Sequence, residues 1–256
     1  MKVIILPTPV DVGEYGAKII LRGVAAGTIT VLGVATGSSP LPVYRALADS
    51  GDTRLGGLDA FALDEYVGLP TSHPQSYRSV IDAEVTVPLG LAPERVHVPE
   101  GAAADVEAAS REYDAAIKAV GGIDLQILGI GSDGHIGFNE PTSSFASRTR
   151  VKTLTPQTRA DNARFFESKD DVPVHCITQG LGTIMEAREI LLIALGEGKA
   201  AAVAEAVEGP VSSMCPASIL QMHPDATVVM DAPAASKLRL TDYYEYVATH
   251  LPAWQR

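Results

Sequence analysis

The chain has 256 residues, of which 46% are hydrophobic and 20% are charged, a composition typical of globular proteins. Its formal net charge of -11 argues against nucleic acid or an anionic membrane as a partner, although a local basic pocket can still bind a small anion. The two cysteines, Cys176 and Cys215, are too few for a disulfide framework and are typical of a reducing compartment.

The first part of the chain alternates strand and helix. An apolar run predicts a strand at 3–8, and a helical pattern follows over 10–26. A second strand is predicted at 28–36. Pro40 then indicates the first turn of a new helix, with Ser39 as its N-terminal cap.

The rest of the chain continues this alternation. The predicted elements are, in order, strands at 58–66 and 95–98, a helix at 104–120, strands at 123–131 and 189–196, a helix that begins at 198 or 199, and a strand at 226–231. Strands separated by helices predict βαβ units. We therefore expect a single domain over residues 1–256, an α/β doubly wound fold whose mostly parallel sheet is flanked by helices. The polar stretch 141–171 is the least core-like part and is a candidate lid or interface.

Polar residues follow four of the predicted strands at their carboxyl ends, where open α/β sheets bind ligands. These residues are Thr36, Gly37, Ser38 and Ser39 after the second strand, Asp64 and Glu65 after the third, Asp133, His135 and Glu140 after the fifth, and Lys199 after the sixth. The sequence thus collects hydroxyls, carboxylates, a histidine and a lysine at one edge of the sheet.

The segment Thr36–Ser39 suits a phosphate group. Its glycine lets the backbone approach closely, its serines supply hydroxyl and N–H groups, and the helix behind it offers its positive end. Lys199 would be the counter-charge. The alternative is a capped turn without a ligand and a solvated lysine, because short motifs often occur by chance.

Asp133, His135 and Glu140 lie within one glycine-rich stretch, GSDGHIGFNEP. A histidine flanked by carboxylates suits a proton shuttle. The same residue types can bind zinc, but no third strong ligand is visible nearby, so we expect acid–base chemistry and no metal. A glycine-rich turn with a capping aspartate is the other alternative.

Asp64 ends an otherwise apolar segment, FALDEY. A carboxylate in that place is often a helix cap or a salt-bridge partner. Partial burial would instead raise its pKa and make it a usable carbon base. The sequence alone leaves these two interpretations open.

Several long motifs in collinear order resemble the glucosamine-6-phosphate deaminases. These motifs are LDEYVGLP with HPQSY, GSDGHIGFNEP, SRTRVKTLT and LGEGKA, and the resemblance extends over about residues 3–231. The related 6-phosphogluconolactonases share the fold and a DGH core, but the continuation IGFNEP is the deaminase form.

The resemblance implies the conversion of glucosamine 6-phosphate into fructose 6-phosphate and ammonia, without a metal or an organic cofactor. Asp64 would move a proton between C2 and C1, and His135 would assist ring opening, supported by Asp133 and Glu140. The residues implied in holding the 6-phosphate are Thr36, Gly37, Ser38, Ser39, Arg164 and Lys199.

The resemblance also implies a second anion site, because some members are hexamers that N-acetylglucosamine 6-phosphate activates. The corresponding residues here are Ser143, Ser144, Arg150 and Lys152. Arg150 and Lys152 alternate on an expected short strand, so they share a face, which is also common for solvated charges. The segment 241–256 departs from the allosteric members, with Glu245 near the position of an aromatic residue. We therefore expect weak or absent activation.

Three other functions are alternatives to the deaminase. They are a galactosamine-6-phosphate deaminase, a hydrolase similar to 6-phosphogluconolactonase, and a sugar-phosphate sensor without activity. Asp64 together with Glu140 favours the deaminase, because a sensor would not need both residues. The expected partner is a small amino sugar phosphate, and the protein is either a monomer or a homo-oligomer.

Two features bear on location. Asp11 and Glu14 follow the first apolar run too early for a secretory signal peptide. No apolar stretch approaches the roughly 18 residues that a membrane-spanning helix needs. We expect a cytoplasmic protein without membrane contact.

Overall fold

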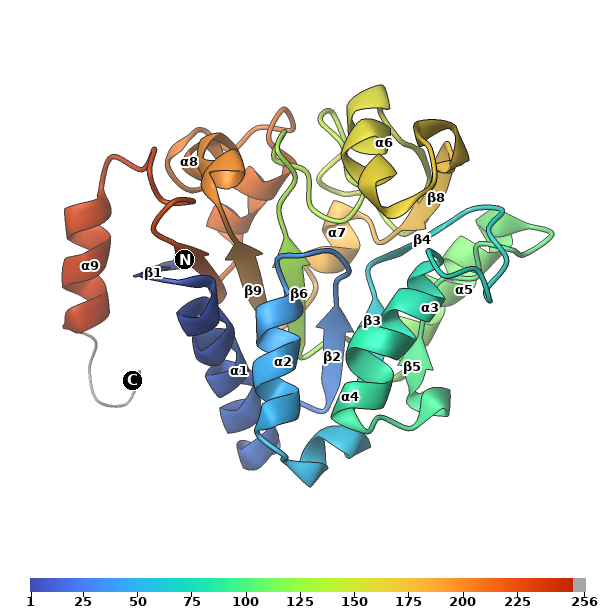
Figure 1. Cartoon of the computed structure of the whole chain (residues 1–256), viewed down its shortest axis with the longest axis horizontal. Helices are drawn as coiled ribbons and strands as arrows, with labels where there is room; N and C mark the ends of the chain where they lie inside the picture. The colour runs from blue at the N-terminus through green and yellow to red at the C-terminus, as the bar shows by residue number, and fades with distance from the viewer. Residues whose placement is uncertain (251–256) are drawn as a thin grey trace.

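The computed structural model describes residues 1–250 (Figure 1). The strands are β1 Lys2–Leu6, β2 Val31–Val34, β3 Asp59–Ala62, β4 Asp64–Tyr66, β5 Val96–His97, β6 Leu125–Gly129, β7 Arg150–Thr153, β8 His175–Thr178, β9 Glu189–Ala194 and β10 Ala226–Asp231. The α-helices are α1 Pro9–Ala26, α2 Leu41–Asp49, α3 Tyr77–Ile81, α4 Val87–Leu89, α5 Val106–Ala119, α6 Pro156–Asn162, α7 Leu181–Ile184, α8 Ala200–Glu208 and α9 Thr241–Thr249. Shorter helical segments are η1 Thr53–Gly57, η2 Asp82–Thr86, η3 Pro93–Arg95, η4 Ala163–Phe165, η5 Lys169–Asp171, η6 Glu197–Lys199 and η7 Pro216–Met222.

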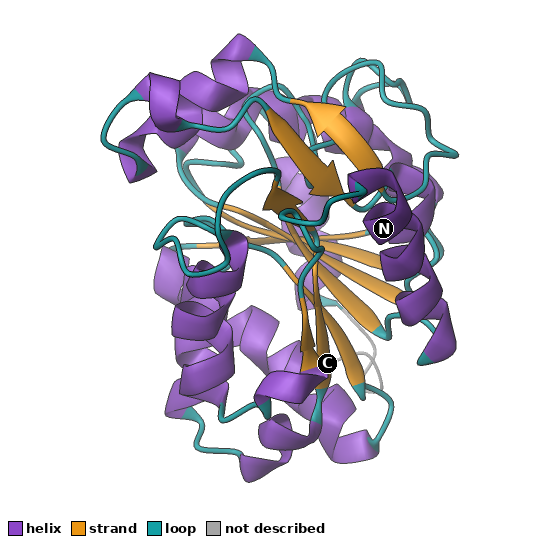
Figure 2. Ribbon diagram, turned by 90° about the vertical axis from the view of Figure 1, so that its right-hand side faces the viewer, coloured by secondary structure: helices purple, strands orange, loops and turns teal. Residues whose placement is uncertain are grey.

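A seven-stranded sheet forms the centre, with the strand order β1-β10-β9-β6-β2-β3-β5. Its strand pairs are all parallel. Figure 2 shows this sheet with helices on both sides. The predicted α/β fold with a mostly parallel sheet flanked by helices is confirmed.

Each central strand contributes to two hydrophobic cores. On β10, Val228 packs in the core formed with α5, α7 and α8, and Val229 packs in the core formed with α1 and α2. Because both faces of a parallel sheet are covered, its strands are continuous apolar runs. This is why the sequence predicted β9 and β10 within two residues.

The predicted strand at 58–66 is wrong as a single element. β3 belongs to the parallel sheet, whereas β4 pairs antiparallel with β8 in a second sheet of order β4-β8-β7. The chain changes sheet at Leu63, whose N–H donates to Val34 O at 3.0 Å while its carbonyl accepts from Gln179 N at 2.8 Å. Every residue from 60 to 66 is buried, so no change in burial marks the break at Leu63.

Ser39 does not cap α2 as predicted. α2 begins at Leu41, and no side chain caps its N-terminus. The carbonyl of Pro40 instead accepts the N–H groups of Val43 and Tyr44, so the first turn closes on the backbone. The hydroxyl of Ser39 is therefore left for other contacts.

The segment 141–171 contains β7, α6, η4 and η5. Figure 1 shows α6 above the ends of the central strands. The segment packs on a small core of its own that includes Tyr66, Phe138, Leu154 and Val172. This placement over the sheet edge fits the expected lid. Among residues 1–250, no helix is long and apolar enough to cross a membrane.

Candidate active site

A cavity of about 830 Å³ lies at the carboxyl edge of the parallel sheet. Residues that follow β2, β3, β6 and β9 line it together with residues of the segment 141–171. The predicted site residues in its wall are Thr36, Gly37, Ser38, Ser39, Asp64, His135, Arg164 and Lys199. The tertiary structure thus brings together groups that lie up to 163 positions apart in the chain.

Asp64 is the first residue of β4 and is only 5% exposed. Within residues 1–250, no hydrogen bond or ion pair reaches its carboxylate, so it is neither a cap nor a salt-bridge partner. Burial, and then the negative charge of Glu65, raise the pKa of Asp64 well above its ordinary value. A buried carboxylate with a raised pKa in a cavity wall suits a general base.

Glu65, the neighbour of Asp64, has a structural role. Its carboxylate accepts the N–H groups of Tyr66, Tyr77 and Arg78 at 2.7, 2.9 and 2.9 Å. It therefore holds the start of α3 against β4. The sequence left open whether Asp64 caps a helix. In the structure it is Glu65 whose carboxylate accepts N–H groups at the start of α3.

The loop after β6 needs glycine at two places. Gly131 donates its N–H to His135 O at 2.9 Å, and a Cβ at Gly131 would lie 2.2 Å from His135 Cε1. Gly137 has a φ of 56°, and a Cβ there would lie 2.9 Å from Thr178 Oγ1. Only glycine leaves room for the imidazole and for the left-handed turn.

His135 lies between two carboxylates. Its Nδ1 is 2.6 Å from Asp133 Oδ1 and 3.7 Å from Glu140 Oε2. Burial opposes ionisation of Asp133, but the hydrogen bond and charge of His135 outweigh it and lower the pKa of Asp133 well below its ordinary value. The arrangement can stabilise an imidazolium ion, which a proton shuttle requires.

The same three residues carry the donor atoms of a metal site. One ligand atom from each lies within 4.8 Å of the others. Two ligands of a tetrahedral zinc, each about 2 Å from the ion, lie roughly 3.3 Å apart. The 2.6 Å contact of Asp133 with His135 is too short for such a pair. This spacing favours a shared proton over a shared metal ion.

Glu140 is 4% exposed and does not itself line the cavity. Its Oε1 accepts the hydroxyl of Thr158 at 2.6 Å and the N–H of Thr155 at 3.2 Å. Both donors belong to the start of α6. The carboxylate is therefore fixed from the segment that covers the cavity.

Two cationic side chains line the same cavity as the predicted phosphate loop. Gly37 has a φ of 95°, Ser38 is exposed and Ser39 is buried. Lys199, the last residue of η6, is half-buried, and burial lowers its pKa. Arg164 is exposed, with its guanidinium 4.7 Å from the centre of the Phe165 ring. The wall of this cavity thus carries hydroxyl groups and two cationic side chains, although the formal net charge of the whole chain is -11.

The four residues of the expected second anion site lie outside the cavity wall. Ser143 Oγ donates to Glu140 O at 2.6 Å, and Arg150 Nη1 donates to Asn139 Oδ1 at 2.9 Å. Ser144 is exposed, and Lys152 shares β7 with Arg150. Glu245 lies on α9, and residues 251–256 of the divergent segment lie outside the described residues.

The sequence did not indicate several residues of the cavity wall. These residues include Tyr77, Phe138, Thr158, Asp161, Asn162 and Phe165. Tyr77 is part of the HPQSY motif, which carried resemblance but no role. Thr155 before a proline was a helix-start signal that could have placed Thr158 and Asp161 on one short helix.

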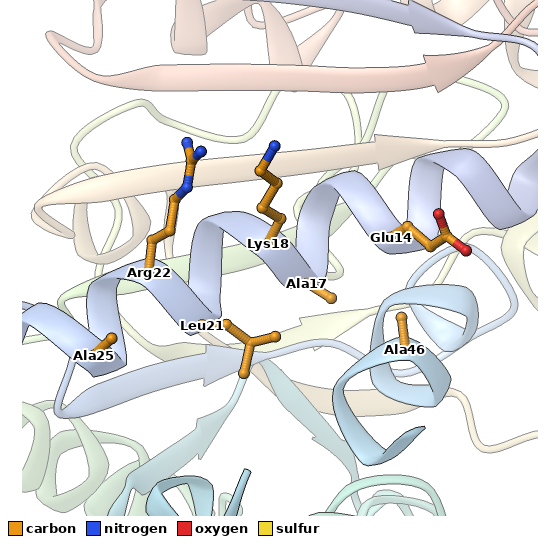
Figure 3. A pocket seen from close by; sticks show the side chains of 7 residues that line it. All are labelled: Glu14, Ala17, Lys18, Leu21, Arg22, Ala25 and Ala46. Carbon is orange, nitrogen blue, oxygen red and sulfur yellow. The ribbon is translucent and has the colours of Figure 1, made fainter. Parts of the chain in front are cut away.

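A second, open hollow of about 350 Å³ is lined by residues of α1 and by Ala46 of α2, whose side chains Figure 3 shows. Leu21 and Ala46 are apolar parts of its wall, while the side chains of Lys18 and Arg22 extend side by side away from α2. It shares no residue with the cavity at the sheet edge. No predicted site residue lies there.

Comparisons with known proteins show the family of the chain. Residues 11–229 match the family described as glucosamine-6-phosphate isomerases/6-phosphogluconolactonase. A glucosamine-6-phosphate deaminase of Streptomyces coelicolor is 56% identical, and one of Arthrobacter sp. (strain FB24) is 58% identical, each over 100% of this chain and 99% of the relative.

Two solved structures are similar in fold. A monomeric glucosamine-6-phosphate deaminase superposes with a TM-score of 0.90 at 40% identity over 93% of this chain and 100% of that chain. The 6-phosphogluconolactonase of Trypanosoma cruzi superposes with a TM-score of 0.76 at 19% identity over 93% and 97%, and that likeness extends to the fold alone. The chain belongs to the glucosamine-6-phosphate isomerase/6-phosphogluconolactonase family.

Proposed function

We propose that the protein converts glucosamine 6-phosphate and water into fructose 6-phosphate and ammonia. The observation that carries this proposal is the shared cavity, whose wall holds a buried base, a histidine beside carboxylates and two cations. The relatives at 56% and 58% identity, both named glucosamine-6-phosphate deaminase, support the same substrate.

Ring opening is assigned to His135. The imidazole takes the proton of the O1 hydroxyl and delivers it to the ring oxygen O5, so the C1–O5 bond breaks and an aldehyde forms. Asp133 and Glu140 stabilise the imidazolium ion that exists between these transfers. General acid–base catalysis of this kind contributes roughly 10² to 10⁴-fold.

Isomerisation is assigned to Asp64. Its carboxylate removes the C2 proton, the electron pair forms a C1=C2 double bond, and O1 takes a proton from the substrate's ammonium group. Asp64 then returns its proton to C1 while the nitrogen lone pair forms a C2=N bond. Water adds to C2 of this iminium ion, and ammonia leaves. The raised pKa of Asp64 suits a base that must also give its proton back.

The 6-phosphate is assigned to the loop Thr36–Ser39 with Arg164 and Lys199. Lys199 can donate to phosphate oxygens from a half-buried position, where water screens its charge less. Binding at this remote group positions C1 and C2 of the open chain against Asp64.

The test measures ammonia and fructose 6-phosphate on glucosamine 6-phosphate and on galactosamine 6-phosphate, with a 6-phosphogluconolactone assay beside it. We expect ammonia and fructose 6-phosphate in equal amounts from the glucosamine compound. Ammonia only from the epimer would reassign the substrate, and lactone hydrolysis without ammonia would refute the deaminase.

Two further assignments accompany this function. Ser143, Ser144, Arg150 and Lys152 would form an anion site that activates weakly or not at all. All residues proposed for the reaction come from one chain, and a solved relative is described as monomeric, so a monomer in solution would suffice for activity. The buried free thiols Cys176 and Cys215 fit a cytoplasmic location.

A further inference from the structure

Thr158 links helix α6 to the carboxylate of Glu140, which lies next to His135. It is the third residue of α6 and is only 4% exposed. Its hydroxyl donates to Glu140 Oε1 at 2.6 Å, the length of a strong hydrogen bond to a charged acceptor. Thr158 also contributes to the cavity wall.

The direction of this hydrogen bond follows from its neighbours. The N–H of Thr158 donates to Oγ1 of Thr155 at 3.1 Å, and Thr155 is the N-terminal cap of α6. The two hydroxyls of Thr155 and Thr158 lie 3.1 Å apart. Because the Glu140 carboxylate can only accept, Thr158 gives it the hydroxyl proton and Thr155 gives its own to Thr158. The cap of α6 and the carboxylate thus form one chain of hydrogen bonds.

The other oxygen of Glu140 faces the pair formed by Asp133 and His135. Glu140 Oε2 is buried and accepts no N–H or hydroxyl group among the described residues, while the Glu140 carboxyl interacts with that of Asp133 and helps to lower the pKa of Asp133. It lies 3.7 Å from His135 Nδ1. Once Thr158 and the N–H of Thr155 hold Oε1, the plane of the carboxylate is set and Oε2 is directed at the imidazole.

We propose that Thr158 is a positioning residue for the deamination, which holds Glu140 so that its other oxygen faces the imidazole of His135. This inference rests on the proposed function. Thr158 shares α6 with Asp161 and Asn162, which also line the cavity. One hydroxyl group therefore links the position of α6 to the orientation of the Glu140 carboxylate.

The experiment compares Thr158→Val, Thr158→Ser and Thr153→Val with the parent protein. Valine keeps the branched shape and the backbone N–H that α6 needs, but it removes the hydroxyl. Thr153 is an exposed residue of β7 and provides a matched control. Circular dichroism and thermal melting establish that each variant is folded.

We expect Thr158→Val to lower kcat by roughly 10-fold, the loss that a hydrogen bond to a charged group implies, with KM for glucosamine 6-phosphate within about twofold of the parent. Thr158→Ser, which keeps the hydroxyl, should recover most of kcat. The side-chain ¹⁵N resonances of His135 should move in Thr158→Val and stay in place in Thr153→Val.

The NMR measurement on His135 tests the positioning role of Thr158 separately from the proposed deaminase function, because it needs no turnover. Unchanged His135 resonances together with a parental kcat in folded Thr158→Val would overturn the positioning role and leave the deaminase intact. A KM increase without a kcat decrease would equally overturn it, since it would place Thr158 in substrate binding. Absence of ammonia from the parent would refute the proposed function, while the His135 resonances would still test the contact.

Discussion

Replacing Asp64 by Asn tests the base in the cavity without disturbing its surroundings. Among residues 1–250, no donor holds the Asp64 carboxylate, so an amide of the same shape breaks no hydrogen bond. The amide cannot take the C2 proton. We expect kcat to fall roughly 10² to 10⁴-fold, which corresponds to a loss of about 3 to 5 kcal/mol of transition-state stabilisation. KM should change much less, because other residues are proposed to bind the phosphate group.

The same substitution should stabilise the fold at neutral pH. Burial and the charge of Glu65 raise the pKa of Asp64, so above the unfolded value of about 3.9 the native state holds a proton that the unfolded state has lost. Stability of the parent therefore falls as pH rises through this window, and the loss is complete above the raised pKa. Asp64→Asn lacks this loss. Its Tm should exceed that of the parent at pH 7, and the difference should shrink toward acidic pH.

Activity of the parent has the opposite dependence on pH. The base must be ionised, so kcat/KM should fall as pH drops through the raised pKa of Asp64, at higher pH than for an ordinary aspartate.

Ammonia release, thermal melting and Asp49→Asn, an exposed control on α2, complete the design. A folded Asp64→Asn protein with near-parental kcat would remove Asp64 from the mechanism, and a lower Tm would contradict the buried-charge argument.

Three further outcomes follow from the site. His135→Gln should lower kcat roughly 100-fold and remove one limb of the pH profile; stoichiometric zinc in the parent, with chelators abolishing activity, would replace the proton shuttle by a metal. Lys199→Ala should raise KM for the phosphorylated sugar, each charged contact contributing about 1.5 to 3 kcal/mol, and the exposed Arg164→Ala should raise it less; equal kcat/KM for glucosamine with and without the phosphate would refute this site. Rate against substrate should be hyperbolic and little changed by N-acetylglucosamine 6-phosphate; a sigmoidal curve that this compound makes hyperbolic would show the expectation wrong, and Arg150→Ala abolishing the shift would locate the effector.

Hydrophobic patterning determined the central sheet. β9 and β10 are buried on both faces, so residues 190–194 and 228–230 are apolar without a break, and a parallel sheet follows from the helix between the two strands. The position of the site followed as well, because parallel strands bring their carboxyl ends to one edge. Thr36, Asp64, His135 and Lys199 were predicted at that edge and lie there.

Contacts between distant segments decided the rest. Leu63 ends one sheet and begins another because its backbone bonds Val34 on one side and Gln179 on the other, and both partners are remote in the chain. The different roles of Asp64 and Glu65 have the same origin. Two adjacent carboxylates have similar local sequence context, and only the docking of α3 gives Glu65 the N–H groups of Tyr77 and Arg78 as partners.

The sequence by itself determined the alternation of strand and helix, the edge where ligands bind and the residue types of the chemistry, because burial and chain direction are local properties of each segment. The hydrogen bond from the Thr158 hydroxyl to Glu140 and the raised pKa of Asp64 were decided by tertiary structure alone. A hydrogen bond needs atoms placed within a few tenths of an ångström, and a pKa depends on every group that excludes water. Neither quantity is a property of one segment, so both arise only when β4, the loop after β6 and α6 pack together.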